Sequence, residues 1–339
     1  PSFHDMVGFM GLRFGAWLVT ALLLGCGDSQ MGEDEAAEPK PDARTLVEVA
    51  VVSRDNVGSF VASTGTVESV AEANLVPETT GTVVETGKGV QGVRTGDRVV
   101  IDGIVSCGKC RWCLEGQTTQ CPSWTAVGFG RDGGLAEYMT WPATQAILLP
   151  DRVSSEAAAL AEPASVAHRA VLRSRLAAGE SVAVLGVGTV GMLAMQVAKS
   201  MGARVYAVDR RQMSLDLALE LGADATVNVE DADVGQALRD LTEGVGPDVV
   251  IDAAGAPNTP AQTVEWVRRG GRVVLVAIYT AKPQFDFNSV VVSETELIGS
   301  LGYLQGNVEA VVGLIASGAL CMTVSDWTIA IVSGSSMRA

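Results

Sequence analysis

One stretch of the sequence, residues 181–209, leaves few choices for the fold. A short apolar segment at 181–185 runs into Gly186-Val187-Gly188-Thr189-Val190-Gly191, then into a helix-forming segment and a second apolar segment that ends at Asp209. Glycines spaced in this way between a strand and a helix permit a tight turn, admit a pyrophosphate close to the main chain and let the helix pack on the strand. The alternative is a glycine-rich turn in another α/β protein, but the whole series favours a dinucleotide site.

The acid at the end of the second apolar segment indicates which dinucleotide binds. Asp209 lies at the distance from the glycines at which a carboxylate accepts hydrogen bonds from the adenosine ribose hydroxyls. A carboxylate there repels a 2'-phosphate, so NAD is expected to bind better than NADP, although a neighbouring arginine, Arg210 or Arg211, can accommodate that phosphate. The residues predicted to bind the cofactor are Gly186, Gly188, Thr189, Val190, Gly191, Asp209 and Arg210.

Strand-like and helix-like segments then alternate along the chain. Apolar runs predict strands at 248–252, at 271–276 and, as an edge strand, at 295–299. Strands separated by helices form a parallel sheet with helices on both faces, so the fold class is α/β with a Rossmann-type, doubly wound sheet. The expected helices lie at 214–221, 234–242, 260–268 and 307–316.

Four cysteines upstream follow the spacing C-x2-C-x2-C-x7-C. They are Cys107, Cys110, Cys113 and Cys121. Short steps let neighbouring thiolates turn onto one centre, and the fourth thiolate closes a tetrahedron, which predicts a structural zinc site. Two disulfides or free buried thiols are the alternatives, but disulfides between residues so close in sequence would be strained. A closed site of four thiolates holds a loop together and performs no chemistry.

The net charge excludes one class of partner. With 39 acidic and 24 basic residues the chain carries a formal charge of -15, which argues against nucleic-acid binding through phosphate contacts. Its 339 residues, 47% of them hydrophobic, suffice for two domains that each bury a core.

The front of the chain has a different character. Residues 10–26 contain an apolar run that is too short to span a bilayer. The run ends in Leu-Leu-Gly-Cys, which resembles the lipobox of bacterial lipoproteins. In those proteins the cysteine, which here is Cys26, is lipidated. A buried core helix is the alternative, but a polar, linker-like tract follows at 27–45. The strands predicted at 45–52 and 60–68 resemble the opening of periplasmic efflux-pump adaptor subunits, although the long helical hairpin of those proteins is absent.

A zinc loop followed by a dinucleotide fold resembles the medium-chain dehydrogenase/reductase family, in particular its polyol, butanediol and threonine dehydrogenase branch. Three segments resemble further family motifs: Gly-Asp-Arg-Val at 96–99, Asp-Gly-Gly-Leu-Ala-Glu-Tyr at 132–138 and Ala-Glu-Pro-Ala-Ser-Val-Ala at 161–167. Phe285–Asn288 and Gly299–Tyr303 look like its later strands. The resemblance spans residues 81–318. It overlaps the adaptor-like segment at 81–90, where we expect a fusion. It implies a truncated GroES-like β-barrel catalytic domain that carries the zinc lobe.

The resemblance also implies a reaction. In that family a second zinc polarises an alcohol, and the alkoxide gives hydride to the nicotinamide. The ligands come from an early cysteine, from a histidine–glutamate pair and sometimes from the glutamate of an E-P-x-S step, which here is Glu162. The other ligands are missing, because no cysteine lies between Cys26 and Cys107 and the histidines are His4 and His168. His168 is expected to be a packing or surface residue, and Glu162 fits equally well as a first-turn acid favoured by the helix dipole.

The chain is therefore expected to be a zinc-containing, NAD(P)-dependent alcohol or polyol dehydrogenase-like oxidoreductase for a secondary alcohol, impaired by its incomplete catalytic zinc site. A non-enzymatic envelope lipoprotein related to efflux-pump adaptors is the alternative. Homo-oligomers through the edge strand near Leu297 and a cytoplasmic location are implied, with membrane association only if Cys26 is lipidated. The predicted segments are 1–26 (signal-like), 27–45 (linker), 46–150 (β-rich, partial GroES-like, with zinc lobe 106–122), 151–305 (Rossmann) and 306–339 (C-terminal helix and trimmed tail).

Overall fold

The computed structural model describes residues 80–134, 136–279 and 281–321. By compactness the chain divides into Pro1–Val67 and Glu68–Ala339, and every described residue belongs to the second unit. The signal-like segment with Cys26, the linker and the adaptor-like strands lie outside the described residues and stay predictions, as do the segment boundaries. In the described part of the chain, no helix has both the length and the apolarity needed to cross a membrane.

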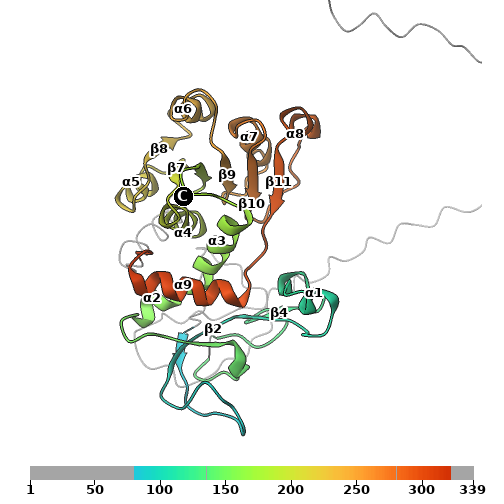
Figure 1. Ribbon diagram of the computed structural model, residues 1–339, viewed down its shortest axis with the longest axis vertical. Helices are drawn as coiled ribbons and strands as arrows, with labels where there is room; N and C mark the ends of the chain where they lie inside the picture. Colours follow the sequence, from blue (N-terminus) through green and yellow to red (C-terminus); the bar gives the residue numbers. More distant parts are fainter. Residues whose placement is uncertain (1–79, 135, 280, 322–339) are drawn as a thin grey trace, which may run out of the picture. The chain divides into compact units, whose positions relative to one another are not determined.

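A six-stranded parallel sheet forms the core of one half of the described residues, in the upper part of Figure 1. Its strands lie in the order β11-β10-β9-β6-β7-β8, and each pair of neighbours is parallel. Strand β6 pairs with β7 on one side and with β9 on the other, so the strand order reverses between β6 and β9. The bounds are β6 Ser181–Leu185, β7 Arg204–Asp209, β8 Ala225–Asn228, β9 Val249–Asp252, β10 Arg272–Leu275 and β11 Glu296–Gly299.

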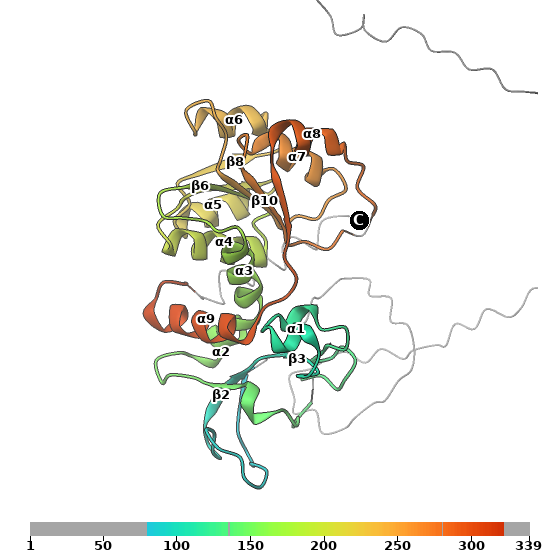
Figure 2. The ribbon, with the colours of Figure 1, turned by 45° about the vertical axis from the view of Figure 1, so that its right-hand side comes forward.

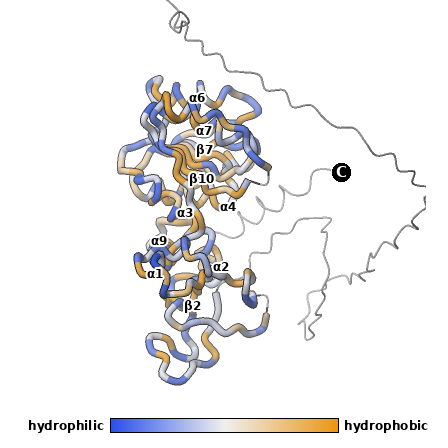
Figure 3. Tube along the Cα trace, turned by 90° about the vertical axis from the view of Figure 1, so that its right-hand side faces the viewer, coloured by the Kyte–Doolittle hydropathy of each residue, from blue (hydrophilic) through white to orange (hydrophobic). Residues whose placement is uncertain are grey.

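Alternate residues of these strands enter two separate cores, as expected for a sheet covered on both faces. Val182 and Val184 pack with helices α3, α4, α5 and α9, whereas Ala183 and Leu185 pack with helices α6 and α7. Figure 3 shows the apolar strands β7 and β10 inside this unit. The helix bounds are α2 Ser155–Ala159, α3 Ala161–Arg173, α4 Thr189–Ser200, α5 Gln212–Glu220, α6 Val234–Asp240, α7 Thr259–Trp266, α8 Phe287–Ser293 and α9 Gln305–Ser317.

The described residues before α2 form two small antiparallel sheets and a compact lobe. One sheet has the order β1-β2-β5, and the other pairs β3 with β4. Helix α9 packs against α2 and α3 (Figure 2). The bounds are β1 Thr80–Thr82, β2 Arg98–Ile101, β3 Ile104–Val105, α1 Arg111–Leu114, the 3-10 turn η1 Thr118–Gln120, β4 Thr125–Ala126, the 3-10 turn η2 Ala143–Gln145 and β5 Ala146–Leu148.

The predicted α/β fold with a doubly wound parallel sheet is confirmed, and β11 is the edge strand that the sequence predicts. Strand β8 lies in a segment for which we made no prediction. The prediction of a strand at Phe285–Asn288 is wrong, because Phe287 begins helix α8: the carboxylate of Asp286 accepts a hydrogen bond from the main-chain N–H of Asn288 at 2.9 Å and so caps the helix. In Gly299–Tyr303 only Gly299 belongs to a strand.

Candidate functional site

A cleft of about 970 Å³ lies at the carboxyl ends of the central strands. Its lining combines the residues that follow β6, the end of β7 and the loop that follows β9, so it sits where the strand order reverses. In open α/β sheets this is where ligands bind. The cleft brings together four of the predicted cofactor residues: Gly186, Gly188, Asp209 and Arg210.

The three glycines of the motif meet different steric demands. Gly186 has φ +83°, and a Cβ added there would lie 2.8 Å from the main chain of Ala254. A Cβ on Gly191 would lie 2.0 Å from the carbonyl oxygen of Gly186, so no side chain fits. Gly188 is different, because the nearest atom to its added Cβ is Nη2 of Arg211 at 3.9 Å. Gly186 and Gly191 are therefore required by the fold, whereas Gly188 keeps space free in the cleft.

Helix α4 begins directly behind this space. Its first residues are Thr189 and Val190, and Gly188 is its N-cap. The first N–H groups of a helix have no carbonyl partner within the helix, and the helix dipole is positive at this end. An anionic group in the cleft in front of Gly188 would be stabilised by both effects.

Asp209 ends β7 at the rim of the cleft and is only 7% exposed. Its Oδ1 accepts a hydrogen bond from the main-chain N–H of Arg211 at 2.9 Å, and Nε of Arg211 lies 3.5 Å from the same oxygen. Arg210 is exposed and also lines the cleft. Arg210 is the arginine predicted from the sequence to bind the cofactor, whereas the structure places Arg211 beside the carboxylate; no local pattern distinguishes the two arginines.

A second buried acid near the cleft was not predicted. Asp252, at the end of β9, is fully buried, and its carboxylate accepts four hydrogen bonds, among them one from Thr259, which lines the cleft. The sequence feature that could have indicated this residue is an acid at the end of an apolar strand, followed by Ala-Ala-Gly. Without these hydrogen bonds, burial would strongly disfavour the charged form of the Asp252 carboxyl group.

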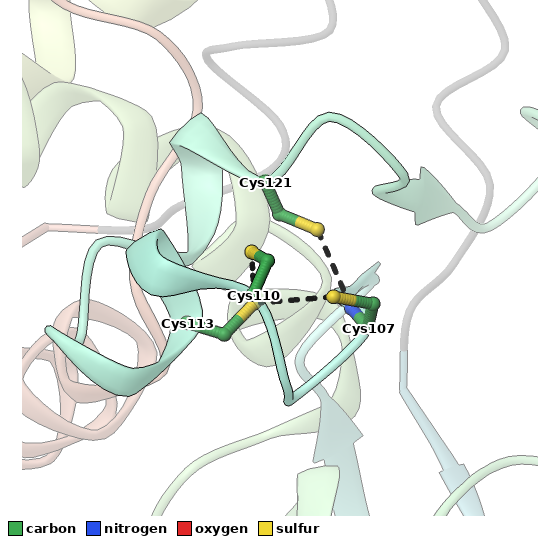
Figure 4. Close-up of side chains that lie close together, drawn as sticks. All are labelled: Cys107, Cys110, Cys113 and Cys121. Atoms are coloured by element: carbon green, nitrogen blue, oxygen red, sulfur yellow. Dashed lines mark hydrogen bonds between the residues drawn. The ribbon is translucent and has the colours of Figure 1, made fainter.

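The four cysteines of the lobe lie close together, as the spacing predicts (Figure 4). All four sulfur atoms lie within 4.8 Å of one another, with Sγ of Cys113 3.4 Å from that of Cys110 and 3.9 Å from that of Cys107. Zinc–sulfur bonds of about 2.3 Å in a tetrahedron require sulfur–sulfur distances of about 3.8 Å. The donor set therefore fits a zinc ion, and none of the four thiols is in a disulfide.

Short turns bring these sulfurs to one centre. Cys107 follows β3, Cys110 is the N-cap of α1, Cys113 lies inside α1, and Cys121 follows η1. Main-chain N–H groups of residues 109 and 110 hydrogen-bond to the sulfur of Cys107 and lower its pKa to about 6. A main-chain hydrogen bond also favours the Cys110 thiolate, but burial and the neighbouring sulfurs outweigh it and raise that pKa to about 11. Four thiols packed together cannot all ionise without a cation, which a zinc ion supplies.

One buried arginine connects this lobe to the Rossmann part. Arg169 of α3 is 6% exposed, and its Nη2 donates a hydrogen bond to Oγ1 of Thr119 at 3.2 Å. Thr119 lies two residues before Cys121, which is itself almost fully buried. The turn that carries Cys121 is thus held against helix α3.

Glu162 lies in the first turn of α3, as predicted, and is partly buried; burial raises the pKa of its carboxyl. His168 is partly buried on the same helix, and its Nδ1 accepts a hydrogen bond from the amide of Asn307 at 3.0 Å. Among the described residues, the cysteine cluster alone brings together three or more donors of the kind that bind metals. The described residues around Glu162 therefore do not fit a catalytic zinc.

Comparisons with known proteins match both halves of this architecture. Residues 42–151 match the alcohol dehydrogenase GroES-like domain, and residues 189–317 match the zinc-binding dehydrogenase family. The first match begins at residue 42, whereas the resemblance by motifs begins only at residue 81.

Individual relatives agree with these matches. The chain is 31% identical to a sorbitol dehydrogenase of Halalkalibacterium halodurans over 295 residues, 85% of each protein. A zinc-binding dehydrogenase structure from Sinorhizobium meliloti, bound to NADP, superposes with a TM-score of 0.68 at 33% identity over 72% of this chain and 73% of that one. The structure of the 2R,3R-butanediol dehydrogenase of Bacillus subtilis superposes with a TM-score of 0.67 at 32% identity, over 74% of this chain and 70% of that one. Matches of this length and identity, together with the cysteine cluster and the cleft, show that the chain belongs to the zinc-type medium-chain dehydrogenase family.

Proposed function

We propose that the chain binds a nicotinamide dinucleotide in the cleft between β6 and β9 and acts as an oxidoreductase on a small secondary alcohol or polyol. The observation that carries this proposal is the open space at Gly188, bordered by the start of α4 and by the carboxylate of Asp209. A bound nicotinamide supplies the hydride chemistry. Sorbitol and butanediol, named in two of the relatives, both contain secondary alcohols, which supports this substrate class.

Each cofactor residue has a distinct proposed role. Gly186 and Gly191 hold the turn, and Gly188 admits the pyrophosphate, which the N–H groups of Thr189 and Val190 stabilise at the start of α4. Asp209 accepts hydrogen bonds from the ribose hydroxyls, and Arg210 borders the same end of the cleft.

The two zinc sites of the family differ in this chain. We propose that Cys107, Cys110, Cys113 and Cys121 hold a structural zinc, which stabilises the lobe and takes no part in the reaction. A zinc bound by Glu162 would need further ligands from residues 1–79, where the only histidine and cysteine are His4 and Cys26. No step of the proposed reaction is therefore assigned to a catalytic zinc.

The dinucleotide preference tests the proposal directly. We expect the wild-type chain to bind NADH more tightly than NADPH, because the buried Asp209 repels a 2'-phosphate. The variant Asp209→Ser removes this charge and frees Arg211, so it is expected to improve binding of NADPH relative to NADH by about tenfold, which corresponds to about 1.4 kcal/mol. Titrations followed by nicotinamide fluorescence measure both affinities, and oxidation of sorbitol and 2,3-butanediol with NAD and NADP tests turnover.

Asp216→Ser is a matched control, since Asp216 is an exposed acid of α5 that does not line the cleft. It is expected to leave both affinities unchanged. If the wild-type chain with its full zinc content binds neither NADH nor NADPH, the proposed function is wrong.

We also propose that the chain assembles with a second copy through the β11 edge. The main chain of an edge strand can pair with another strand, and helix α8 beside it exposes Phe287 (69%) and Val291 (74%), which lie one helical turn apart. An isologous dimer would cover both features. The variant Val291→Glu is expected to shift the chain toward monomers in light scattering, whereas Leu114→Glu, at an exposed site on the cysteine lobe, is expected to leave its mass unchanged.

A further inference from the structure

Asp252 connects parts of the chain that are separate in sequence. Its Oδ1 accepts hydrogen bonds from the main-chain N–H groups of Ala254 at 3.0 Å and Gly255 at 3.2 Å. Its Oδ2 accepts one from Oγ1 of Thr259 at 2.5 Å and one from the hydroxyl of Tyr279 at 2.7 Å. All four donors are uncharged, and together they satisfy a carboxylate that has no exposure to solvent.

The main chain of Asp252 adds a second set of connections. Its carbonyl oxygen accepts hydrogen bonds from the N–H groups of Val276 at 3.1 Å and Ala277 at 3.2 Å, directly after β10. The next residue, Ala253, donates to the carbonyl of Leu185, the last residue of β6. The carboxyl ends of β6, β9 and β10 are therefore joined through the two consecutive residues Asp252 and Ala253.

The loop after β9 forms one wall of the cleft. Ala253, Ala254 and Thr259 all line it. Ala254 touches the turn of the glycine motif, since a Cβ on Gly186 would lie 2.8 Å from its N, Cα and Cβ atoms. A change in the position of Ala254 would therefore move either the cleft wall or the turn that receives the pyrophosphate.

The loop after β10 supports this wall from the other side. Gly255 has φ +68°, and a Cβ added to it would lie 2.9 Å from the Cβ of Ala277 and 3.3 Å from the carbonyl oxygen of Ile278. The neighbouring Tyr279 is partly buried and is not among the residues that line the cleft. Its hydroxyl donates to the carboxylate of Asp252 at 2.7 Å and also interacts with the hydroxyl of Thr259, so it supports the cleft wall from behind.

We propose that Asp252 is a positioning residue for the dinucleotide, and that the hydroxyl of Tyr279 helps to set cofactor affinity by orienting the Asp252 carboxylate from outside the cleft. This inference rests on the proposed function, because it takes the cleft to be the cofactor site. The carboxylate holds Ala254 and Thr259 in the arrangement that the cofactor meets. Loss of one donor leaves it underbonded, and the loop after β9 then shifts or becomes more mobile.

The test compares two tyrosine-to-phenylalanine variants in the full chain. Tyr279→Phe removes the hydroxyl that donates to Asp252, and Tyr206→Phe removes a hydroxyl in the same sheet that donates to the carbonyl of Leu241 at 3.0 Å, away from the cleft. Tyr279→Phe is expected to weaken NADH binding about fivefold in a fluorescence titration, and Tyr206→Phe is expected to leave it unchanged. Thermal unfolding of both variants shows how far each change affects stability alone.

Thr259 supplies a rescue experiment within the same network. Thr259→Val loses the hydrogen bond to Oδ2 and is expected to weaken NADH binding, whereas Thr259→Ser keeps the hydroxyl and is expected to restore the wild-type affinity. The proposal is overturned if Tyr279→Phe binds NADH as tightly as the wild type, or if Tyr206→Phe loses as much affinity as Tyr279→Phe. Failure of the wild-type chain to bind NADH would instead contradict the proposed function.

Discussion

Replacing Cys121 with serine is expected to remove the zinc from the protein. Cys121 is 1% exposed and lies within 4.8 Å of the other three sulfurs, so no other described side chain can take its place in the tetrahedron. Binding of a structural zinc by four thiolates contributes on the order of 10 kcal/mol at neutral pH. The Cys121→Ser chain is therefore expected to purify with less than about a tenth of the wild-type zinc and to unfold at a lower temperature. Elemental analysis and thermal unfolding measure the two effects.

A second cysteine outside the cluster provides the control. Cys321 is exposed and does not belong to the metal cluster, so Cys321→Ser is expected to keep the full zinc content. Acid should reproduce the loss of metal in the wild type. Protons compete with zinc for all four thiolates, so zinc content and thermal stability are expected to fall together as the pH is lowered. Equal zinc content in Cys121→Ser and wild type would show that the cluster is not the metal site.

Two alanine substitutions in the glycine motif are expected to impair different properties, one the stability of the fold and the other only the binding of NADH. Gly191→Ala places a Cβ 2.0 Å from the carbonyl oxygen of Gly186, which only a shift of helix α4 can relieve. We expect it to destabilise the fold by about 4 kcal/mol and to abolish NADH binding. Gly188→Ala keeps an allowed backbone, since Gly188 has φ -76°, and its Cβ meets nothing closer than 3.9 Å. That variant should unfold like the wild type and bind NADH at least about tenfold more weakly.

Thermal unfolding and NADH titration of the two variants separate these effects. A stable Gly188→Ala chain with unchanged affinity would mean that the pyrophosphate does not pass over Gly188. A Gly191→Ala chain as stable as the wild type would mean that helix α4 is less tightly packed against the turn than the contact implies. Each outcome contradicts a different part of the proposed site.

The parts of the site that were predictable from sequence are those built from short stretches of chain. The cysteine cluster spans 107–121, and the glycine turn and Asp209 lie within one strand–helix–strand unit, so residue spacing nearly determines their geometry. The parallel sheet was likewise predictable, because strands separated by helices have few other arrangements.

The rest depends on contacts between distant segments. Tyr279 lies 27 residues after Asp252, and no spacing rule connects an acid at one strand end to a hydroxyl beyond the next strand. The choice between Arg210 and Arg211 depends on the backbone at the end of β7, where the N–H of Arg211 returns to Asp209. The strand at Phe285–Asn288 was expected from a resemblance to the later strands of the family, whereas the cap that Asp286 provides starts helix α8 at Phe287.

Helix α3 restricts how this chain can be divided into fragments. One side of it consists of the fully buried residues Ala161, Ala164, Ala167 and Ala170, and it packs against both α4 and α9. A fragment that ends before α9 would expose small-residue surface to water with nothing of matching shape to cover it. Helix α9 is thus an integral part of the nucleotide-binding half, and a useful fragment for expression has to extend at least through Ser317.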